Sequence, residues 1–406
     1  MILSSRKRTE NIRKTGRYPM KKTKGTMPME KLAAQLQKRA LPPVLPAHPV
    51  SGSMTVEEWK TRKEELNALL ARELYGVTPA EYRNLPIRAE ADAEMPVDFE
   101  HTCAGKAETR RYHLVLSLPD GTEYRIPFVL HLPKKEGKLP VILHIAFRED
   151  YPDIYLPVEE IIDRGYALLH FCYQDASPDR MHGDFSGGLA AHFIGNPRRN
   201  DEWGDIGIWA YTATRFMDWI GTQESLDASC VSVTGHSRLG KTALWCGAQD
   251  ERFFCTYCND GGYAGSGLIR GKIGEDIEDF FRCGSWSWFC ENFKEYRNRP
   301  YEDLPYDMHF LVAAAAPRYV YIASAETDGC MDYTSDFLSA AAASEVWEAL
   351  GHPGLVTEDR LPVPGETVLH EGRIGYHVRR GTHYLSREDW GHFMDFLDRK
   401  RAESGK

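Results

Sequence analysis

The sequence predicts an α/β fold with a mostly parallel central sheet and helices on both of its faces. The segments 140–145 and 166–171 are apolar except for one histidine in each, which is typical of parallel strands buried on both sides. Helical patterns alternate with such segments along the chain, as layered α/β folds require. The most informative segment, 231–245, passes from a short apolar strand through Gly-x-Ser-x-x-Gly at 235–240 into a helix. With 406 residues, of which 42% are hydrophobic, the chain can bury a large core.

Charge divides the chain into a basic start and an acidic remainder. Residues 1–25 carry nine Lys or Arg against one acidic residue, Glu10, although the net charge of the whole chain is −9. Those residues therefore carry about +8, which leaves about −17 for the rest. We expect 1–30 to be a disordered tail and 31–406 to be a single domain. The acidic body argues against nucleic acid as a partner.

Membrane, secretion and metal-binding patterns are not evident in the sequence. No segment is apolar over the roughly 20 residues that a bilayer-spanning helix needs, and the first thirty residues lack the apolar stretch of a secretory signal. We therefore expect a cytoplasmic protein with no membrane partner. The nine scattered cysteines favour reduced thiols, and Cys255-x-x-Cys258 lies in apolar sequence that predicts a buried strand rather than a zinc site. No metal and no cofactor are expected.

The first part of this domain predicts a helical lead over 31–76 and then a β-hairpin. Apolar residues recur at helical spacing among charged ones over 55–75, and Thr55-x-x-Glu58 is a possible capping box. Over 108–132 apolar and polar residues alternate, with Pro119-Asp-Gly121 between two runs. This pattern is typical of two antiparallel strands joined by a turn.

The rest of the chain predicts strands that alternate with helices. The predicted elements are strand 140–145, helix 158–165, strand 166–171, helix 205–221, strand 231–234, a helix after the serine, strands 254–258, 319–324 and 373–378, and a closing helix 390–397. The aromatic segment 261–310 is expected to form a lid or a pocket wall rather than a second domain. This order, with the serine at the carboxyl end of a central strand, predicts an α/β-hydrolase fold.

Ser237 is predicted to be a nucleophile. Gly235 and Gly240 allow the backbone to turn sharply, so that the serine stands off the end of its strand. The N-terminus of the following helix offers backbone N–H groups to a developing oxyanion. The motif alone also occurs in ordinary turns, but here β-branched residues stop at Thr234 and helix formers begin just after the serine.

A serine nucleophile needs a general base, and in this fold the histidine follows both the serine and the acid in the chain. His383 lies in the loop after the last predicted strand, from which it can reach over the sheet edge. His377 is the rival, but it lies inside that strand, where a packed histidine is the commoner outcome. Three other histidines are expected to be structural or supporting groups: His144, His170 and His236.

Two carboxylates compete for the role of the orienting acid. Asp328 follows strand 319–324 at the usual position, whereas Asp260 follows the strand after the elbow and could reach the same histidine. The sequence favours Asp328 and leaves Asp260 open, with Glu326 and Asp332 as lesser candidates. Either carboxylate would fix the imidazole tautomer and stabilise the imidazolium.

The residues around the serine resemble those of a known family. The elbow Gly235-His-Ser-Arg-Leu-Gly-Lys241 is similar to the Gly-x-Ser-Arg-x-Gly-Lys elbow of glucuronoyl esterases, carbohydrate esterase family 15. The resemblance extends through most of 120–395. Supporting stretches are 147–157, Asp201-Glu-Trp-Gly204, Trp288-Phe-Cys-Glu-Asn-Phe293, Ala315-Ala-Pro-Arg318, Ser324-Ala-Glu-x-Asp328 and Gly381-Thr-His383.

The resemblance implies roles for four more residues. In the family, the arginine after the serine helps to hold the oxyanion, which implies that role for Arg238. A lysine, an aromatic residue and a glutamate contact the uronic-acid ring, which implies Lys241, Trp288 and Glu275. Such roles suit an ammonium donor and an indole face. Cys330 stands where many bacterial relatives have Trp, so one wall of the sugar site differs.

The sequence and the resemblance together predict a serine carboxylic-ester hydrolase with 31–406 as its catalytic domain. The expected substrates are plant-cell-wall carbohydrate esters, above all 4-O-methyl-glucuronoyl esters of glucuronoxylan-derived oligosaccharides, cleaved through an acyl-enzyme. Two alternatives stay open: an acetyl-xylan or other short-acyl esterase on the same fold, and a non-catalytic carbohydrate-binding relative. The complete order Ser, Asp, His argues against the second alternative. No oligomeric state is predicted.

Overall fold

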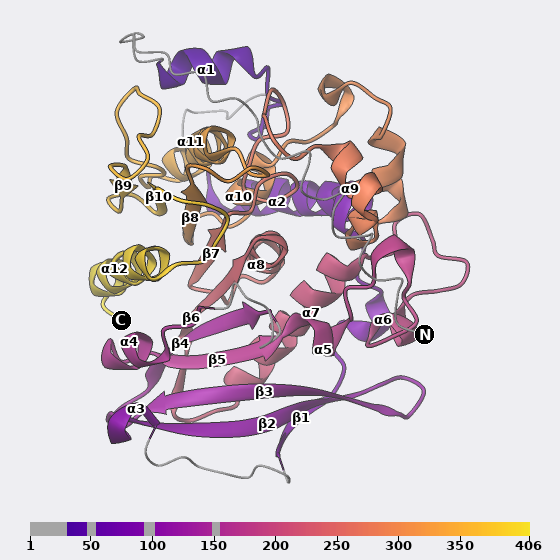
Figure 1. Ribbon diagram of the computed structural model, residues 1–406, viewed down its shortest axis with the longest axis vertical. Helices are drawn as coiled ribbons and strands as arrows, with labels where there is room; N and C mark the ends of the chain where they lie inside the picture. The colour runs from indigo at the N-terminus through magenta and orange to yellow at the C-terminus, as the bar shows by residue number, and fades with distance from the viewer. Residues whose placement is uncertain (1–30, 47–53, 93–101, 148–154) are drawn as a thin grey trace, which may run out of the picture.

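The structure is a computed structural model that describes residues 31–46, 54–92, 102–147 and 155–406. The described residues form a ten-stranded sheet in the order β1-β2-β3-β5-β4-β6-β7-β8-β10-β9 (Figure 1). The predicted α/β-hydrolase fold is confirmed, because the inner strands are parallel and helices cover both faces. The expected tail 1–30, and the part of the family-like stretch 147–157 that falls at 148–154, lie outside the described residues.

Antiparallel strands form one end of the sheet. β1 (Ile87–Ala91) pairs with β2 (Ala107–Ser117), which pairs with β3 (Glu123–Pro133), and β3 joins the rest of the sheet through β5. The predicted hairpin over 108–132 is therefore confirmed. Its turn contains Gly121 with φ 82°, a conformation that glycine adopts without strain. The sequence reading missed β1, whose residues are only partly buried.

The inner strands are parallel and follow the predicted order. They are β4 (Leu139–Ala146), β5 (Ala167–Cys172), β6 (Leu226–His236), β7 (Cys255–Asn259), β8 (Tyr319–Ala325) and β10 (Ile374–Arg379). The short strand β9 (Val368–Leu369) pairs with β10 in the antiparallel direction. Every residue of β4, β7 and β10 is buried, including the polar residues of β7 and β10. Because parallel strands end at one edge, the loops after β6, β7, β8 and β10 meet there.

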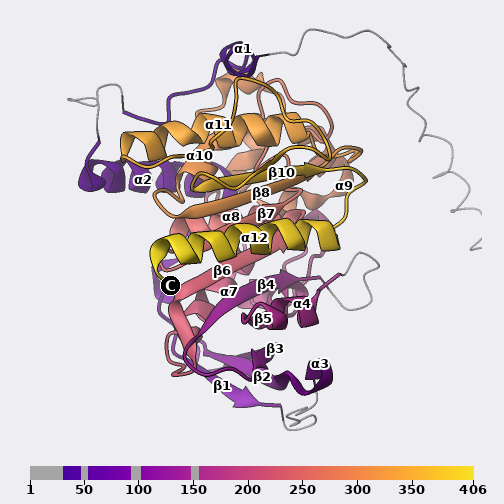
Figure 2. The ribbon, with the colours of Figure 1, turned by 90° about the vertical axis from the view of Figure 1, so that its left-hand side faces the viewer.

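Helices cover both faces of the sheet. α7 (Asp205–Ile220), α8 (Arg238–Gln249) and α11 (Tyr333–Ala349) contribute to the larger apolar core on one face. α4 (Val158–Asp163) and α12 (Arg387–Ser404) enclose a smaller cluster on the other. Figure 2 shows α12 in front of the strands and α7 and α8 behind them. Among the residues that the structure describes, no helix is long and apolar enough to cross a bilayer.

The N-terminal helix begins at the predicted capping box. The Glu58 N–H donates to Thr55 Oγ1 (3.2 Å), and the Thr55 N–H donates to Glu58 Oε2 (2.7 Å). α2 (Val56–Leu70) continues as a π-helical turn over Ala71–Tyr75, so the helical segment ends where the pattern predicts. The other short helices are α1 (Leu32–Lys38), α3 (Thr102–Gly105), α5 (Tyr173–Ala176), α6 (Ala190–Phe193), α9 (Ile277–Cys283) and α10 (His309–Ala313), with 3₁₀ turns at Ala80–Tyr82, Met181–Gly183, Ser285–Trp288, Glu291–Tyr296 and Tyr301–Asp303.

The segment 261–310 consists of turns and short helices and lies beside the carboxyl edge of the sheet. A buried ion pair holds it together, since Arg270 Nη1 lies 3.1 Å from Asp307 Oδ2. Asp307 also accepts hydrogen bonds from the backbone N–H groups of Ile269 and Arg270. The segment supplies Glu275 and Trp288 to the pocket around the serine, which is where a pocket wall was expected.

Five of the nine cysteines are buried and pack as small apolar residues. All nine lie in the described part of the chain and are free thiols. Cys255 and Cys258 are buried in β7, as the apolar sequence around them predicts, and burial raises the pKa of both thiols. Both side chains therefore stay protonated and packed in the sheet.

Candidate active site

Ser237 stands at a sharp turn between β6 and α8. Its backbone has φ 57° and ψ −126°, a strained conformation for a residue with a side chain and one that functional sites often contain. Close packing explains why both Gly235 and Gly240 are glycines. A Cβ on Gly235 would lie 2.1 Å from the carbonyl oxygen of Leu239, and a Cβ on Gly240 would lie 2.9 Å from the carbonyl oxygen of Asn259. The Ser237 N–H donates to the same Asn259 carbonyl at 2.8 Å and holds the turn against β7.

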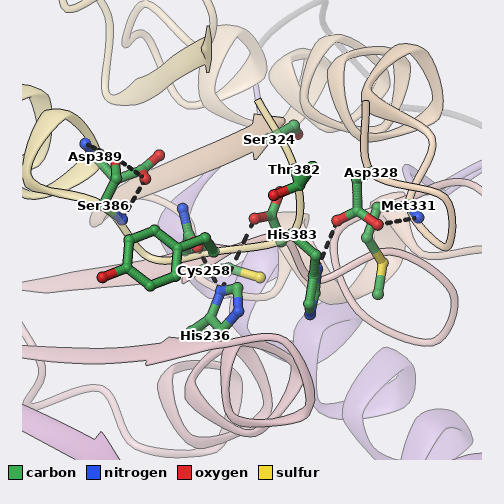
Figure 3. A network of polar contacts seen from close by, with 12 residues as sticks. His236, Cys258, Ser324, Asp328, Met331, Thr382, His383, Ser386 and Asp389 are labelled. Carbon is green, nitrogen blue, oxygen red and sulfur yellow. Dashed lines mark hydrogen bonds and ion pairs between the residues drawn. The ribbon is translucent and has the colours of Figure 1, made fainter. Parts of the chain in front are cut away.

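His383 and Asp328 meet at the carboxyl edge of the sheet, from the loops after β10 and β8 (Figure 3). His383 Nδ1 lies 2.5 Å from Asp328 Oδ2. The other oxygen of Asp328 accepts from the backbone N–H groups of Cys330 (2.9 Å) and Met331 (3.1 Å). Burial would raise the pKa of Asp328, but His383 and these N–H groups together hold that pKa below its usual value. Asp328 is thus an ionised partner that fixes the tautomer of His383.

Arg379, the last residue of β10, clamps the loop that carries His383. Its Nη2 donates to the Thr382 carbonyl (2.9 Å) and to the Tyr384 carbonyl, which lie on either side of the histidine. Its Nε donates to Asp389 Oδ2 in α12 (2.6 Å). The clamp ties the histidine loop to a packed helix, and the sequence reading did not single it out.

Asp260, the alternative acid, is buried beside this clamp. Its Oδ2 lies 3.8 Å from Arg379 Nη2, and neither of its oxygens has a hydrogen-bond partner within the described ranges. Burial, with the charges of Asp389 and Asp328, raises the pKa of Asp260 well above its usual value. The geometry therefore pairs His383 with Asp328 and leaves Asp260 as a buried carboxyl beside Arg379.

His236, beside the nucleophile, supports the imidazole of His383. The two ring centroids are 4.4 Å apart, and Figure 3 shows the rings next to each other. His236 Nδ1 lies 2.6 Å from Asn259 Oδ1, and burial with the charge of His383 lowers the pKa of His236 to about 3. With Asp260, the two histidines place possible metal-ligand atoms within 4.8 Å of one another. Because Nδ1 of each ring already has a partner, we interpret the group as packing around His383.

The other candidate histidines lie away from the serine. His377 is buried in β10 on the α12 side, where its Nε2 lies 2.9 Å from Asp389 Oδ1 and its Nδ1 lies 2.9 Å from the Tyr321 hydroxyl. His144 in β4 is buried and His170 in β5 is partly buried, and burial lowers the pKa of both to about 3. All three lie where the sequence expects structural histidines.

Arg238 and Trp288 lie against each other in the pocket. The guanidinium carbon of Arg238 lies 4.6 Å from the centre of the Trp288 ring. Asp179, in the loop after α5, holds both residues: it pairs with Arg238 Nη1 and accepts from Trp288 Nε1 at 2.8 Å. The sequence reading missed Asp179. The one feature of the sequence that could have indicated Asp179 is its position in a loop at the carboxyl end of the sheet, where binding and catalytic residues are commonly found.

Lys241 lies one turn into α8 and is almost fully buried. Its Nζ donates to the carbonyls of Gly261 and Tyr263, at 2.7 Å each, and lies 3.4 Å from Glu275 Oε2. These contacts use the three N–H donors of the ammonium and tie the segment 261–310 to the elbow helix. Lys241 thus brings positive charge to the pocket wall, while Glu275 presents a carboxylate.

The predicted residues converge on one pocket of about 230 Å³. It is lined by Phe147, His236, Ser237, Arg238, Lys241, Glu275, Trp288, Cys330, Met331 and His383. Among the predicted residues, the two carboxylates Asp328 and Asp260 stand behind this lining. Its volume lies below the range of about 300–1,000 Å³ for drug-sized ligands, which suits the binding of a single small group.

Known proteins resemble this chain over most of the region that forms the site. The family described as glucuronyl esterase of fungi matches residues 118–351. Carbohydrate esterase MZ0003, from an unknown prokaryotic organism, is 36% identical over 244 residues, which are 59% of this chain and 55% of that protein. A 4-O-methyl-glucuronoyl methylesterase of Podospora anserina is 31% identical over 307 residues, 72% of this chain and 57% of its own length.

A solved structure has the same fold over nearly the whole of this chain. A carbohydrate esterase family 15 glucuronoyl esterase from Teredinibacter turnerae has a TM-score of 0.77 and 26% sequence identity, over 93% of this chain and 94% of that chain. This chain spans little more than half the length of MZ0003 and of the Podospora anserina relative. The family match covers more than half of this chain and contains both the elbow and Asp328. This chain belongs to the glucuronoyl esterase family.

Proposed function

We propose that this chain hydrolyses carboxylic esters of uronic acids through a covalent acyl-enzyme, with 4-O-methyl-glucuronoyl esters of plant-cell-wall carbohydrate as substrates. The observation that carries the proposal is the position of Ser237, on its strained elbow, in the same pocket as His383 with its Asp328 partner. Relatives described as 4-O-methyl-glucuronoyl methylesterases support the substrate class.

The geometry suits acyl transfer to Ser237. Its Oγ attacks the ester carbonyl carbon while the proton passes to His383 Nε2, the nitrogen that Asp328 leaves available. The carbonyl electrons become an oxyanion, and ionised Asp328 stabilises the imidazolium. The bond to the alcohol oxygen then breaks, and the alcohol leaves with the proton from His383. Water attacks the acyl-serine in the same way and releases the free uronic acid.

Positive charge and backbone dipoles surround the reacting carbonyl. Arg238 is the first residue of α8, so its guanidinium and the N-terminus of that helix both lie beside Ser237. Donors that face a developing oxyanion are commonly worth about 3–4 kcal/mol each. Lys241 adds a second cation from the pocket wall, and the Trp288 ring supplies an apolar face for the sugar.

Two substrates and two variants test this proposal. We expect the wild type to hydrolyse benzyl glucuronate with a higher kcat/KM than p-nitrophenyl acetate. Ser237→Ala is expected to lose about 10⁴-fold or more in kcat, because the remaining donors cannot replace the nucleophile. Ser229→Ala is the matched control, since Ser229 is exposed at the far end of the same strand. It is expected to keep full activity.

Each contrary outcome identifies an alternative. A wild type that prefers the acetate would contradict uronate esters as substrates and favour a short-acyl carbohydrate esterase. Turnover that Ser237→Ala leaves unchanged would contradict the role of the serine. A wild type with no turnover of either ester, but with measurable binding of glucuronate by calorimetry, would favour the carbohydrate-binding alternative.

A further inference from the structure

One carboxylate outside the pocket lining holds both Arg238 and Trp288. Asp179 pairs with Arg238 Nη1 through one oxygen and accepts from Trp288 Nε1 at 2.8 Å through the other. Its side chain is only 2% exposed, and it is not among the described residues that line the pocket. Asp179 therefore acts on a ligand through Arg238 and not by contact.

The cations of the pocket each face a carboxylate. Arg238 faces Asp179, and Lys241 lies 3.4 Å from Glu275. Asp205, which is also buried near Asp179, has a pKa raised well above its usual value by burial and by the charge of Asp179. Asp179 is the carboxylate in contact with Arg238, and the two cations therefore do not present an uncompensated double positive charge to a ligand.

Substrate and product of ester hydrolysis differ in charge at the reacting carbon. The ester carbonyl is neutral, whereas the released uronic acid is an anion at neutral pH. An Arg and a Lys without counter-ions would bind that anion far more tightly than the ester and would slow its release. A buried carboxylate at contact distance from the guanidinium opposes this binding, because electrostatic interactions between poorly solvated charges are strong.

We propose that Asp179 is a counter-ion and positioning residue that orients Arg238 and Trp288 and keeps the site from retaining the uronate product. This inference rests on the proposed function. In the reaction, the orientation of Arg238 serves the transient oxyanion. After the reaction, the charge of Asp179 weakens the hold of Arg238 on the product carboxylate, so that the site favours neutral esters over uronate anions.

Inhibition constants for a charged and a neutral ligand test this inference. Glucuronate and glucuronamide differ at the carbon that Ser237 would attack, and both can be measured as competitive inhibitors of benzyl glucuronate hydrolysis at low salt. In Asp179→Asn, we expect Ki for glucuronate to fall about tenfold and Ki for glucuronamide to change less than about twofold. Asp184→Asn removes the same charge from an exposed position nearby and is expected to change neither Ki more than about twofold.

A role in packing alone predicts a different result. If Asp179 only supports the pocket, both ligands bind Asp179→Asn more weakly and in equal proportion, which would overturn the inference. If that variant does not fold, the wild type decides: it is expected to bind glucuronate no more than about tenfold tighter than glucuronamide, and a greater preference overturns the inference. Failure of the proposed function is seen separately, as a wild type that does not hydrolyse benzyl glucuronate.

Discussion

Asp328 and His383 are 55 residues apart in the chain, yet Asp328 Oδ2 lies 2.5 Å from His383 Nδ1. Two parallel strands, β8 and β10, produce this contact because they are direct neighbours in the sheet and end at the same edge. Backbone N–H groups of the next turn hold the carboxylate, and Arg379 holds the histidine loop from the other side. The pair is thus built on rigid elements, as a precise catalytic contact requires.

Separate replacement of the two candidate acids distinguishes them. Asp328→Asn is expected to lower kcat about 10⁴-fold, because the amide would leave His383 in the wrong tautomer. Asp260→Asn is expected to keep kcat within about threefold, because His383 Nδ1 is paired with Asp328 and not with Asp260. Steady-state kinetics on benzyl glucuronate measure both variants. A large loss in Asp260→Asn with little loss in Asp328→Asn would reverse the assignment.

Arg379 is expected to matter for rate more than for affinity. A lysine at this position lacks the planar fork that reaches two loop carbonyls and Asp389 together. Arg379→Lys is therefore expected to lower kcat about 10- to 100-fold through misplacement of His383, with KM changed less than about threefold. Arg380→Lys, at the exposed next residue, is the control and is expected to behave as the wild type. Equal losses in both variants would contradict the clamp.

The fold and the nucleophile could be read from the sequence because their signals are local. The elbow around Ser237 needs glycines where a Cβ would strike the backbone, and both are present in the motif. The largely apolar sequences of β4 and β5 predict buried parallel strands. His383 follows from the position of its loop after the last strand. β6 begins at Leu226, earlier than the predicted 231, because residues 227–229 are partly buried or exposed and carry a weak pattern.

The remaining contacts could not be read from the sequence because they join distant segments. Asp179 lies 59 residues before Arg238, in a loop whose composition indicates only a turn. The clamp made by Arg379 uses backbone carbonyls, which leave no side-chain signature. The resemblance implies that Lys241 contacts a ligand, but it gives no sign that Lys241 Nζ also donates to the carbonyls of Gly261 and Tyr263. Three-dimensional packing decides such pairs, and no periodicity encodes them.

Gly235 in the elbow is expected to be important for the stability of the fold as well as for function. A Cβ at Gly235 would lie 2.1 Å from a backbone oxygen that cannot move without shifting α8. Gly235→Ala is therefore expected to lower the free energy of unfolding by about 3 kcal/mol or more. Gly391→Ala is the control, because Gly391 lies in α12 with no atom within 4 Å of an added Cβ. It is expected to gain about 0.5–1 kcal/mol from helix propensity, and urea unfolding measures both.

Buried neutral histidines are expected to make the fold sensitive to acid. Burial lowers the pKa of His144, His170 and His236 to about 3, whereas an unfolded histidine titrates near 6.5. Between these values the unfolded chain binds more protons than the folded one. The contribution of these histidines to the free energy of unfolding is therefore at its maximum above about pH 6.5. Below that pH the free energy of unfolding falls, by up to about 1.4 kcal/mol per pH unit for each histidine.

Urea unfolding at several values between about pH 5 and pH 7.5 measures this slope. The slope reports how many more protons the unfolded chain binds than the folded one. His144→Gln is expected to lower this number by about one, because it removes one buried titrating group. His192→Gln removes an exposed histidine and is expected to leave the slope unchanged. A slope that is the same in His144→Gln and in the wild type would show that this histidine does not contribute to the acid sensitivity.

Cys330 is expected to be the thiol through which alkylation inactivates the enzyme. It lines the pocket and is exposed, whereas Cys283, also exposed, ends α9 outside that lining. Burial and the nearby carboxylates raise the pKa of Cys330, so its reaction with iodoacetamide is expected to be slow at neutral pH and to accelerate as pH rises. The added group would fill part of the 230 Å³ cavity and exclude the substrate.

The activity that remains after increasing times with iodoacetamide measures this effect. Activity is expected to fall in the wild type and in Cys283→Ser but to persist in Cys330→Ser, and glucuronamide is expected to protect the wild type. Inactivation of Cys330→Ser at the wild-type rate would place the sensitive thiol elsewhere.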